Sequence, residues 1–423
     1  MPTILLLGTL DTKLPELLYL RSLIFSLGPT STKILLLDVG RTPISHPAIT
    51  TTQSTLATHY APNEGIQDPS TLPRGEVTKY MTLCASNYLR HLLKTTPVHA
   101  LISAGGSGNT SLAAAVMRDV LPVGFPKLIV STMASGDVRQ IVGETDITLM
   151  YSVVDIAGLN SVLRGVLSNA AGAIVGMAGA YEKGLQEEVA AEGVGKRQLR
   201  VALTMFGVTT PGVTAAKAFL EREYGVECFV FHCTGAGGRA MERLVAEGRI
   251  DAVLDVTTTE VCDLLFEGNM SAGPERLEAA LEAGVPNVIS VGATDMVNFG
   301  PRETVPERYK GRKLYEHNPT VTLMRASVEE CRAVGEFIVE KIKRFASDES
   351  MVEVVLPKGG VSMIAVPGAA FADQEADEAL FAAIERGLEG TGVSVTVDER
   401  AINDETFAID LAERLARKLG LEK

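Results

Sequence analysis

The sequence contains no tryptophan, and aromatic residues make up only 5% of its 423 positions. Its five cysteines form no CxxC pair and no Cys/His pattern with the spacing of a zinc site. Basic residues are also scarce, since 39 Lys and Arg stand against 52 Asp and Glu, for a net charge of −13. Nucleic acids and anionic membranes select a basic face that neutralises phosphates, so neither is expected as a partner.

Long apolar runs are absent as well, because none approaches the ~20 residues that a membrane span requires. The N-terminal segment MPTILLLGTLDTK lacks a basic region before its apolar residues and lacks a small-residue cleavage site. It therefore does not read as a signal peptide. Together with cysteines that read as reduced thiols, these features predict a cytoplasmic protein.

What the chain does contain is 40 glycines and 46% hydrophobic residues. Short aliphatic runs recur along it, each followed by a Gly, Ser, Thr or Asp cluster and then by a helical pattern. This order is typical of βαβ units with parallel strands. We expect strands in eleven runs: Ile4–Leu7, Ile34–Leu37, Ala100–Ile102, Leu128–Val130, Ile147–Met150, Val201–Met205, Cys228–Phe231, Ala252–Leu254, Val288–Val291, Val352–Leu356 and Val393–Val397.

The series of runs is interrupted once, by a charged and glycine-punctuated stretch. We therefore predict an α/β protein of two Rossmann-like, doubly wound domains with mainly parallel sheets. The expected boundaries are 1–185 for a nucleotide-binding domain, 186–199 for a linker and 200–423 for a second domain. Residues 41–74, rich in Thr, Ser and Pro, are expected to form either a variable surface loop or a functional lid.

Ligands of open α/β sheets bind beyond the carboxyl ends of the strands, so the loops there are the candidate sites. The loop after the third run, SAGGSGNT, has three glycines within four residues, which allow consecutive amides to turn toward phosphate oxygens. It is neither a Walker loop nor GxGxxG. After the first run, the motif GTLDTK offers hydroxyl groups and a lysine. After the second run, DVG offers an acidic residue that could bind a ribose. After the fourth run, STMASGD offers further hydroxyl groups. An ordinary capped turn is the alternative for any one of these loops taken alone.

These four loops supply the predicted nucleotide-binding residues. They are Gly8, Thr9, Asp11, Thr12, Lys13, Asp38, Val39, Gly40, Gly105, Gly106, Ser107, Gly108, Asn109, Thr110, Ser131, Thr132, Ser135 and Gly136.

The second half has its own glycine-rich loop, HCTGAGG, which could hold a phosphate or carboxylate at the start of a helix. The predicted second anion site consists of Thr209, Thr210, Thr234, Gly235, Gly237, Gly238 and Arg325. If the strand ends converge, His232, Glu260, Asp295 and His317 would be candidates for acid/base chemistry or for holding a divalent metal. A lone histidine after a strand is more often structural, and Cys233 is more simply a buried residue than a nucleophile. No metal site is assigned.

The motifs named above, with FGVTTPG, DVTTTE, SVGATDMVNFGPRETVPERY, HNPTVTLMR and KGGVS, resemble the ATP-binding "Tm one-like" family. This is a family of uncharacterised proteins that includes the N-terminal half of the tomato mosaic virus resistance protein. The resemblance covers nearly the whole chain. It implies two Rossmann-like domains, ATP with Mg²⁺ in the first, and a homodimer. Three positions depart from the family's pattern: Asn109 replaces a frequent glycine, Cys233 a usual alanine, and Ala365 a frequent Asp.

The leading hypothesis is an ATP-binding protein that, if it is an enzyme, acts on a small anionic metabolite in a cleft between the domains. One alternative is a non-catalytic, nucleotide-dependent module for protein interaction. Another is an ATP-independent isomerase or hydrolase of the C-terminal cleft. In the plant relative a further domain follows, whereas this chain ends at Lys423, so we do not expect the antiviral role here.

Overall fold

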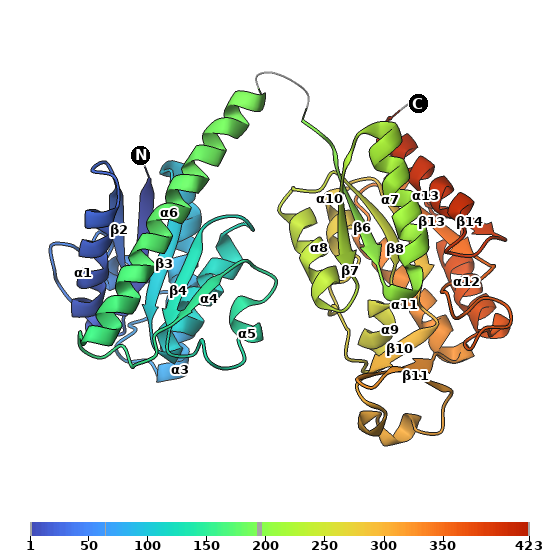
Figure 1. Cartoon of the computed structure of the whole chain (residues 1–423), viewed down its shortest axis with the longest axis horizontal. Coiled ribbons are helices and arrows are strands. Elements are labelled where there is room, and N and C mark those ends of the chain that lie inside the picture. The colour runs from blue at the N-terminus through green and yellow to red at the C-terminus, as the bar shows by residue number, and fades with distance from the viewer. Residues whose placement is uncertain (1, 64, 193–196, 422–423) are drawn as a thin grey trace. The chain divides into compact units, whose positions relative to one another are not determined.

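The computed structural model describes residues 2–63, 65–192 and 197–421. It divides into two units, Met1–Lys196 and Arg197–Lys423. The predicted linker, 186–199, begins inside a helix that continues to Glu192, and its residues 193–196 lie outside the described ranges. Each unit is an α/β fold built on a parallel sheet, which confirms the predicted fold class (Figure 1).

The first unit is a five-stranded parallel sheet in the order β2-β1-β3-β4-β5. Its strands are β1 (Thr3–Gly8), β2 (Lys33–Asp38), β3 (Ala100–Gly105), β4 (Lys127–Ser131) and β5 (Thr148–Tyr151). Its helices are α1 (Leu10–Leu27), α2 (Gln53–His59), α3 (Arg74–Thr95), α4 (Ser107–Val120), α5 (Arg139–Val142) and α6 (Ser161–Glu192). Alternate residues of the central strands enter two apolar cores, one beneath α1 and α6 and the other beneath α2, α3 and α4. This two-sided burial explains why the strands read as continuous aliphatic runs.

The second unit contains a six-stranded parallel sheet in the order β14-β13-β9-β8-β6-β7. Its strands are β6 (Arg200–Met205), β7 (Glu227–His232), β8 (Ala252–Thr257), β9 (Asn287–Gly292), β13 (Val352–Pro357) and β14 (Ser394–Asp398). Helices α7 (Thr210–Tyr224) and α13 (Glu405–Lys418) cover one face. The other face is covered by α8 (Ala236–Ala246), α10 (Glu278–Ala283), α11 (Val328–Phe345) and α12 (Gln374–Leu388).

Two features were not expected from the sequence. A small antiparallel sheet, in the order β10-β12-β11, follows β9 and is formed by β10 (Met296–Phe299), β11 (Leu314–Asn318) and β12 (Val321–Arg325). In the first unit, the segment expected to be a loop contains α2, and Thr51 pairs with Leu37 at the edge of the sheet. Strands of four or five residues and a seven-residue helix are too short to show a clear hydrophobic period in a sequence.

Helix α6 is unusually long and apolar. Its segment Ser161–Glu187 is long and apolar enough to cross a membrane by length and composition, although no run of that length was expected. The segment qualifies because alanine and glycine replace charged residues along it, not because of continuous large side chains. Six of its side chains form part of the core against the sheet and α1: Leu163, Leu167, Ala170, Ala171, Ile174 and Ala178.

Candidate functional site

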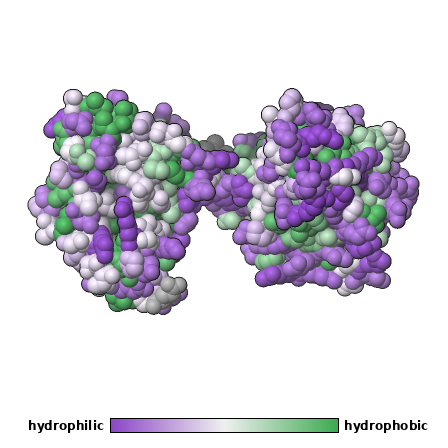
Figure 2. Space-filling model, turned by 90° about the horizontal axis from the view of Figure 1, so that it is seen from below, coloured by the Kyte–Doolittle hydropathy of each residue, from purple (hydrophilic) through white to green (hydrophobic). Residues whose placement is uncertain are grey.

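The four predicted nucleotide loops lie at one edge of the first sheet and are joined there by hydrogen bonds. Because β2, β1, β3 and β4 are consecutive neighbours and parallel, their carboxyl ends meet at the same edge. Helix α6, which follows β5 in the chain, begins on the lower side of this unit in Figure 1. Figure 2 views the molecule from that side, and on the first unit this face is largely pale and green with scattered hydrophilic groups.

The Asn109 side chain connects the loop after β1 to the end of β3 by hydrogen bonds. Its Oδ1 accepts a hydrogen bond from the Thr9 amide at 3.3 Å, and its Nδ2 donates to Ser103 Oγ at 2.8 Å. The Asn109 side chain packs so closely under Gly105 that a Cβ on that glycine would lie 2.6 Å from it. Asn109 therefore supports the loop from below, which gives a structural reason for the asparagine at a position where the family often has glycine.

The amino end of α4 presents its amides without protein acceptors. Gly106 is the N-cap residue and provides no side-chain cap, and Thr110 N bonds to Gly106 O. Within the described ranges, no acceptor pairs with the amides of Ser107, Gly108 and Asn109. A Cβ on Gly108 would meet nothing within 4 Å, and one on Gly106 would meet only Thr132 Oγ1 at 3.9 Å. Open space thus faces three free donors at the positive end of a helix dipole, the geometry that binds anions.

One oxygen of the predicted ribose acceptor, Asp38, is used inside the protein, and its buried Oδ2 has no partner among the described atoms. Asp38 is fully buried, and its Oδ1 accepts from the amides of Leu10 at 3.2 Å and Gly40 at 2.9 Å. Burial raises the pKa of Asp38 to about 6, against the lowering effect of those two amides. Asp11 is used in the same way, because its Oδ2 accepts from the amides of Arg41 and Thr42. These two carboxylates hold the loops after β1 and β2 in place.

The remaining predicted nucleotide residues line the same edge. Lys13, at a non-helical break within α1, makes no ion pair with any described carboxylate, and the hydroxyls of Thr9 and Thr12 lie 3.3 Å apart. Gly8 and Val39 are buried backbone positions, and Val39 N donates to Gly8 O. After β4, the hydroxyls of Ser131 and Thr110 lie 2.7 Å apart, while Thr132 N bonds to Gly105 O. Beyond them, Ser135 and Gly136 are exposed.

One segment of this edge was missed by the sequence analysis. Residues 152–160 lead from β5 at the margin of the sheet to α6, which packs against α1. The segment is anchored to α1 by the buried Glu16, whose Oε1 accepts from Gly158 N at 2.6 Å. Its sequence, SVVDIAGLN, carries no glycine cluster or charge pattern that would mark it as part of a site.

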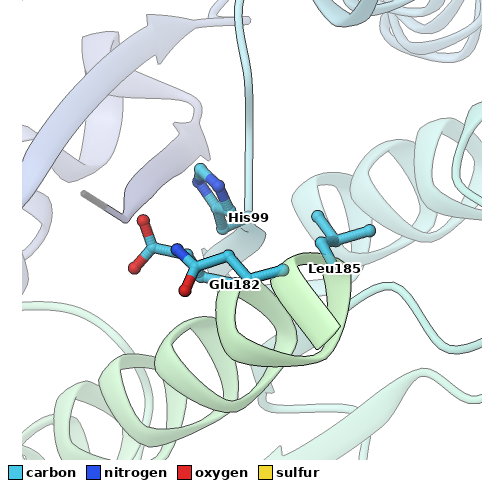
Figure 3. A pocket seen from close by; sticks show the side chains of 4 residues that line it. His99, Glu182 and Leu185 are labelled. Carbon is cyan, nitrogen blue, oxygen red and sulfur yellow. The ribbon is translucent and has the colours of Figure 1, made fainter. Parts of the chain in front are cut away.

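A surface pocket lies at the opposite edge of the same sheet (Figure 3). Figure 3 shows His99, which immediately precedes β3, beside Glu182 and Leu185 of α6. His99 Nδ1 accepts a hydrogen bond from Thr3 N at 2.9 Å, and burial lowers its pKa. This pocket contains none of the predicted site residues and lies at the amino ends of the strands, where α/β sheets rarely bind ligands.

In the second unit, the corresponding glycine-rich loop already holds a carboxylate from the protein. Glu260 is fully buried, and its Oε1 accepts from Gly235 N at 2.7 Å and Gly238 N at 3.1 Å. A Cβ on Gly238 would lie 2.0 Å from Glu260 Oε2, so only glycine permits this approach. Two of the amides predicted to bind an external anion therefore bind Glu260.

Arg276 neutralises that carboxylate. Its Nε lies 3.0 Å from Glu260 Oε2, and its two terminal nitrogens bind Asp255 at 2.6 and 2.7 Å. Glu242 also accepts from Arg276, at 3.2 Å, and from two amides of the segment before and within α10. Arg276 and Asp255 are each 1% exposed. The cluster is a buried network in which three carboxylates share Arg276, rather than an open acid/base site.

Asp295 and Arg325 belong to a second buried cluster. Asp295 accepts from Ser362 Oγ at 2.9 Å through Oδ2, whereas its buried Oδ1 has no partner among the described atoms. Burial raises the pKa of Asp295 to about 7, opposed by the charge of Arg325. Arg325 pairs with Asp377 at 2.6 Å and donates to the carbonyl of Phe371. This predicted anion-binding arginine is therefore paired with a carboxylate of its own unit.

The other candidates of the second unit are dispersed. His232 is exposed at the end of β7 and stacks on Phe206, with ring centroids 5.6 Å apart, whereas His317 is exposed on β11 of the small antiparallel sheet. Cys233 is buried, and burial raises its pKa well above the ordinary value, unlike an activated thiol. Three predicted hydroxyls bond within the protein, namely those of Thr209, Thr210 and Thr234. Gly237 packs against the His232 carbonyl. No group of three or more potential metal ligands occurs in the part of the chain that the structure describes.

Comparisons with known proteins agree on one family. The N-terminal domain of an uncharacterised protein family, UPF0261, matches residues 2–183, and the C-terminal domain of that family matches residues 198–419. A UPF0261 protein of Clostridium tetani is 44% identical over 412 residues, covering 97% of this chain and 98% of that protein. The ToMV resistance protein Tm-1 of Solanum lycopersicum is 39% identical over 424 residues, covering 97% of this chain and 55% of the tomato protein. The family membership drawn from the motifs is confirmed, whereas the ATP, the Mg²⁺ and the homodimer that the resemblance implied stay predictions.

The first prediction concerns Glu260. Replacing it in Glu260→Ala should leave two buried amides and the Arg276 Nε donor without their acceptor, although Arg276 keeps Asp255 and Glu242. We expect the free energy of unfolding to fall by about 3–5 kcal/mol. Urea denaturation measures this, with the exposed Glu275→Ala as the matched control that should change little. Equal stability of the two variants would show that Glu260 is not a structural anion.

The second prediction concerns pH. Burial raises the pKa of Asp295 to about 7 in the folded chain. The protonated Asp295 side chain therefore contributes fully to the free energy of unfolding below the pKa of the unfolded chain, and this contribution is lost as the pH rises through 7. Asp295→Asn removes this loss, so the stability difference between variant and wild type should shift in favour of the variant by on the order of 2 kcal/mol between pH 5 and pH 8. Parallel stability curves over that range, from denaturant titrations, would contradict the assignment.

Proposed function

The chain belongs to the uncharacterised UPF0261 family, and from that premise we propose that its first unit binds ATP at the carboxyl edge of the β2-β1-β3-β4-β5 sheet. The proposal rests on the amides of Ser107, Gly108 and Asn109 at the start of α4, which have no acceptor among the described residues. They face space that two glycines leave open. Helix starts of this kind bind phosphate groups through their amides and dipole.

The loops around α4 favour a polyphosphate over a single small anion. The loop after β1 is fixed beside α4 by the Thr9–Asn109 hydrogen bond, and it carries Lys13, a cation without a described carboxylate partner. On the other side, Thr132 is linked to Gly105 through its amide. Lys13 with the Thr9 and Thr12 hydroxyls on one side of the free amides, and the Thr132 hydroxyl on the other, suit a chain of phosphates. Mg²⁺ would bind to the phosphates and keep most of its water ligands.

The proposal does not extend to the second unit. There the amides of Gly235 and Gly238 are already bound by Glu260, and Arg325 is already bound by Asp377. An external anion would have to displace a buried carboxylate that is itself paired with Arg276. Within the second unit, the geometry therefore supports stability rather than anion binding. Cytoplasmic location and a homodimer remain predictions.

The third prediction tests ATP binding with Gly106→Val. A Cβ at this position meets no atom closer than 3.9 Å, and the backbone angles of Gly106, φ −79° and ψ −167°, suit an L-residue. The variant should therefore fold while its methyl groups occupy the space in front of the amides. We expect ATP with Mg²⁺ to bind at least about tenfold more weakly, measured by isothermal titration calorimetry.

The control for this experiment is Gly172→Val on the exposed side of α6, another position where a Cβ meets nothing within 4 Å. It should bind ATP as the wild type does, and denaturation without nucleotide checks that both variants fold. If the wild type shows no heat of binding at millimolar ATP, the function proposed here is wrong. If Gly106→Val binds as tightly as the wild type, the site is not at α4.

A further inference from the structure

Val153 is held in a conformation that valine avoids. Its φ is +65°, and β-branched residues rarely adopt positive φ because the branched side chain crowds the backbone. The residue forms the centre of a tight three-residue turn closed by a hydrogen bond from Val154 N to Ser152 O at 2.7 Å. Two further bonds fix the turn, from Ser152 Oγ to Val154 O and from Ser152 N to Ser131 O.

Packing of the Val153 side chain does not compensate for this strain. Val153 is 60% exposed, so its side chain is not held by core packing. A glycine at the same place would form the turn without strain and would lose no buried contact of comparable size. Strained residues of this kind persist where the side chain has a use beyond the fold, and they gather at binding sites.

Two more large apolar side chains are exposed at the ends of the same pair of strands. Met133, two residues beyond β4, is 45% exposed, and Tyr151, the last residue of β5, is 42% exposed. Ser131 and Tyr151 are paired in the β4–β5 register, so the two loops leave the sheet side by side. We call Met133, Tyr151 and Val153 the ring platform. A polarizable thioether, an aromatic ring and a branched aliphatic group are side chains on which a planar ring can pack.

The ring platform is joined to the amino end of α4 through β4. Thr110 and Ser131 share a hydrogen bond, and Thr132 N bonds to Gly105 O. Strand ends are about 4.8 Å apart in a sheet, so β3 and β5 end about 10 Å from each other. The sugar and first phosphate of a nucleotide can span this distance.

From this geometry we infer that the ring platform binds the base of the nucleotide. The inference rests on the proposed binding of phosphates at α4 and adds the direction in which the ligand lies, from β3 toward β5. The base packs on Met133, Tyr151 and Val153, and the platform provides affinity for a nucleotide over inorganic polyphosphate. The strain at Val153 is retained because glycine would remove the apolar contact.

The test is Val153→Gly, with ATP and inorganic tripolyphosphate as two probes titrated in the presence of Mg²⁺. Glycine accepts φ +65°, so the variant should unfold at the same denaturant concentration as the wild type or a higher one. The wild type should bind ATP more tightly than tripolyphosphate. In the variant, ATP affinity should fall about fivefold or more while tripolyphosphate affinity stays unchanged.

Two variants complete the experiment. Met133→Ser should act in the same direction as Val153→Gly, whereas Val230→Gly, at an exposed valine on the other sheet, should leave both affinities unchanged. Equal binding of the two probes by the wild type, or a Val153→Gly variant that keeps wild-type affinity for ATP or weakens both probes alike, would overturn the ring platform and leave phosphate binding standing. Binding of neither probe by the wild type would overturn both proposals.

Discussion

The arrangement of this protein depends on how each parallel sheet satisfies the backbone amides that point outward from its carboxyl edge. In the second unit, Glu260 supplies the negative charge from within the chain and Arg276 balances it. In the first unit, Asn109 and Asp38 satisfy the amides of the loop after β1, but the amides at the start of α4 have no acceptor among the described residues. The same electrostatic demand is thus met internally in one unit and has no internal acceptor at the start of α4 in the described part of the other.

This contrast shows that two glycine-rich loops that look alike in sequence differ in whether a protein carboxylate binds their amides. In HCTGAGG the glycines are required by packing, because Gly237 contacts the His232 carbonyl and Gly238 contacts Glu260. In AGGSGNT only Gly105 is required in this way, whereas Gly106 and Gly108 face open space. A glycine that packing does not require costs backbone entropy, so its presence points to a requirement outside the folded chain.

Much of this could be predicted from the sequence, and what was missed has a common physical cause. The central strands were found because both of their faces are buried, which leaves continuous aliphatic runs such as Ile4–Leu7. That the four predicted loops lie together could be foreseen because parallel strands end at a common edge. By contrast, the pairing of Glu260 with Arg276 and of Arg325 with Asp377 joins residues 16 and 52 positions apart. No local pattern reveals which charged residues meet in a core, and so residues that neutralise one another were read as candidates for chemistry.

Val153 shows the complementary limit. A valine after a strand is ordinary in a sequence, and only the backbone angle and the exposure of the side chain together distinguish it. Hydrogen bonds within Ser152–Val154 and from Ser152 N to Ser131 O hold its turn. Ser131 is also hydrogen-bonded to Thr110 of α4, so the strained turn is connected to α4 through the end of β4. Phosphate recognition by backbone amides needs only small residues and is visible as composition, whereas recognition of a ring needs exposed apolar side chains that resemble any other surface position. A sequence therefore reveals the charged end of such a ligand more readily than its apolar end.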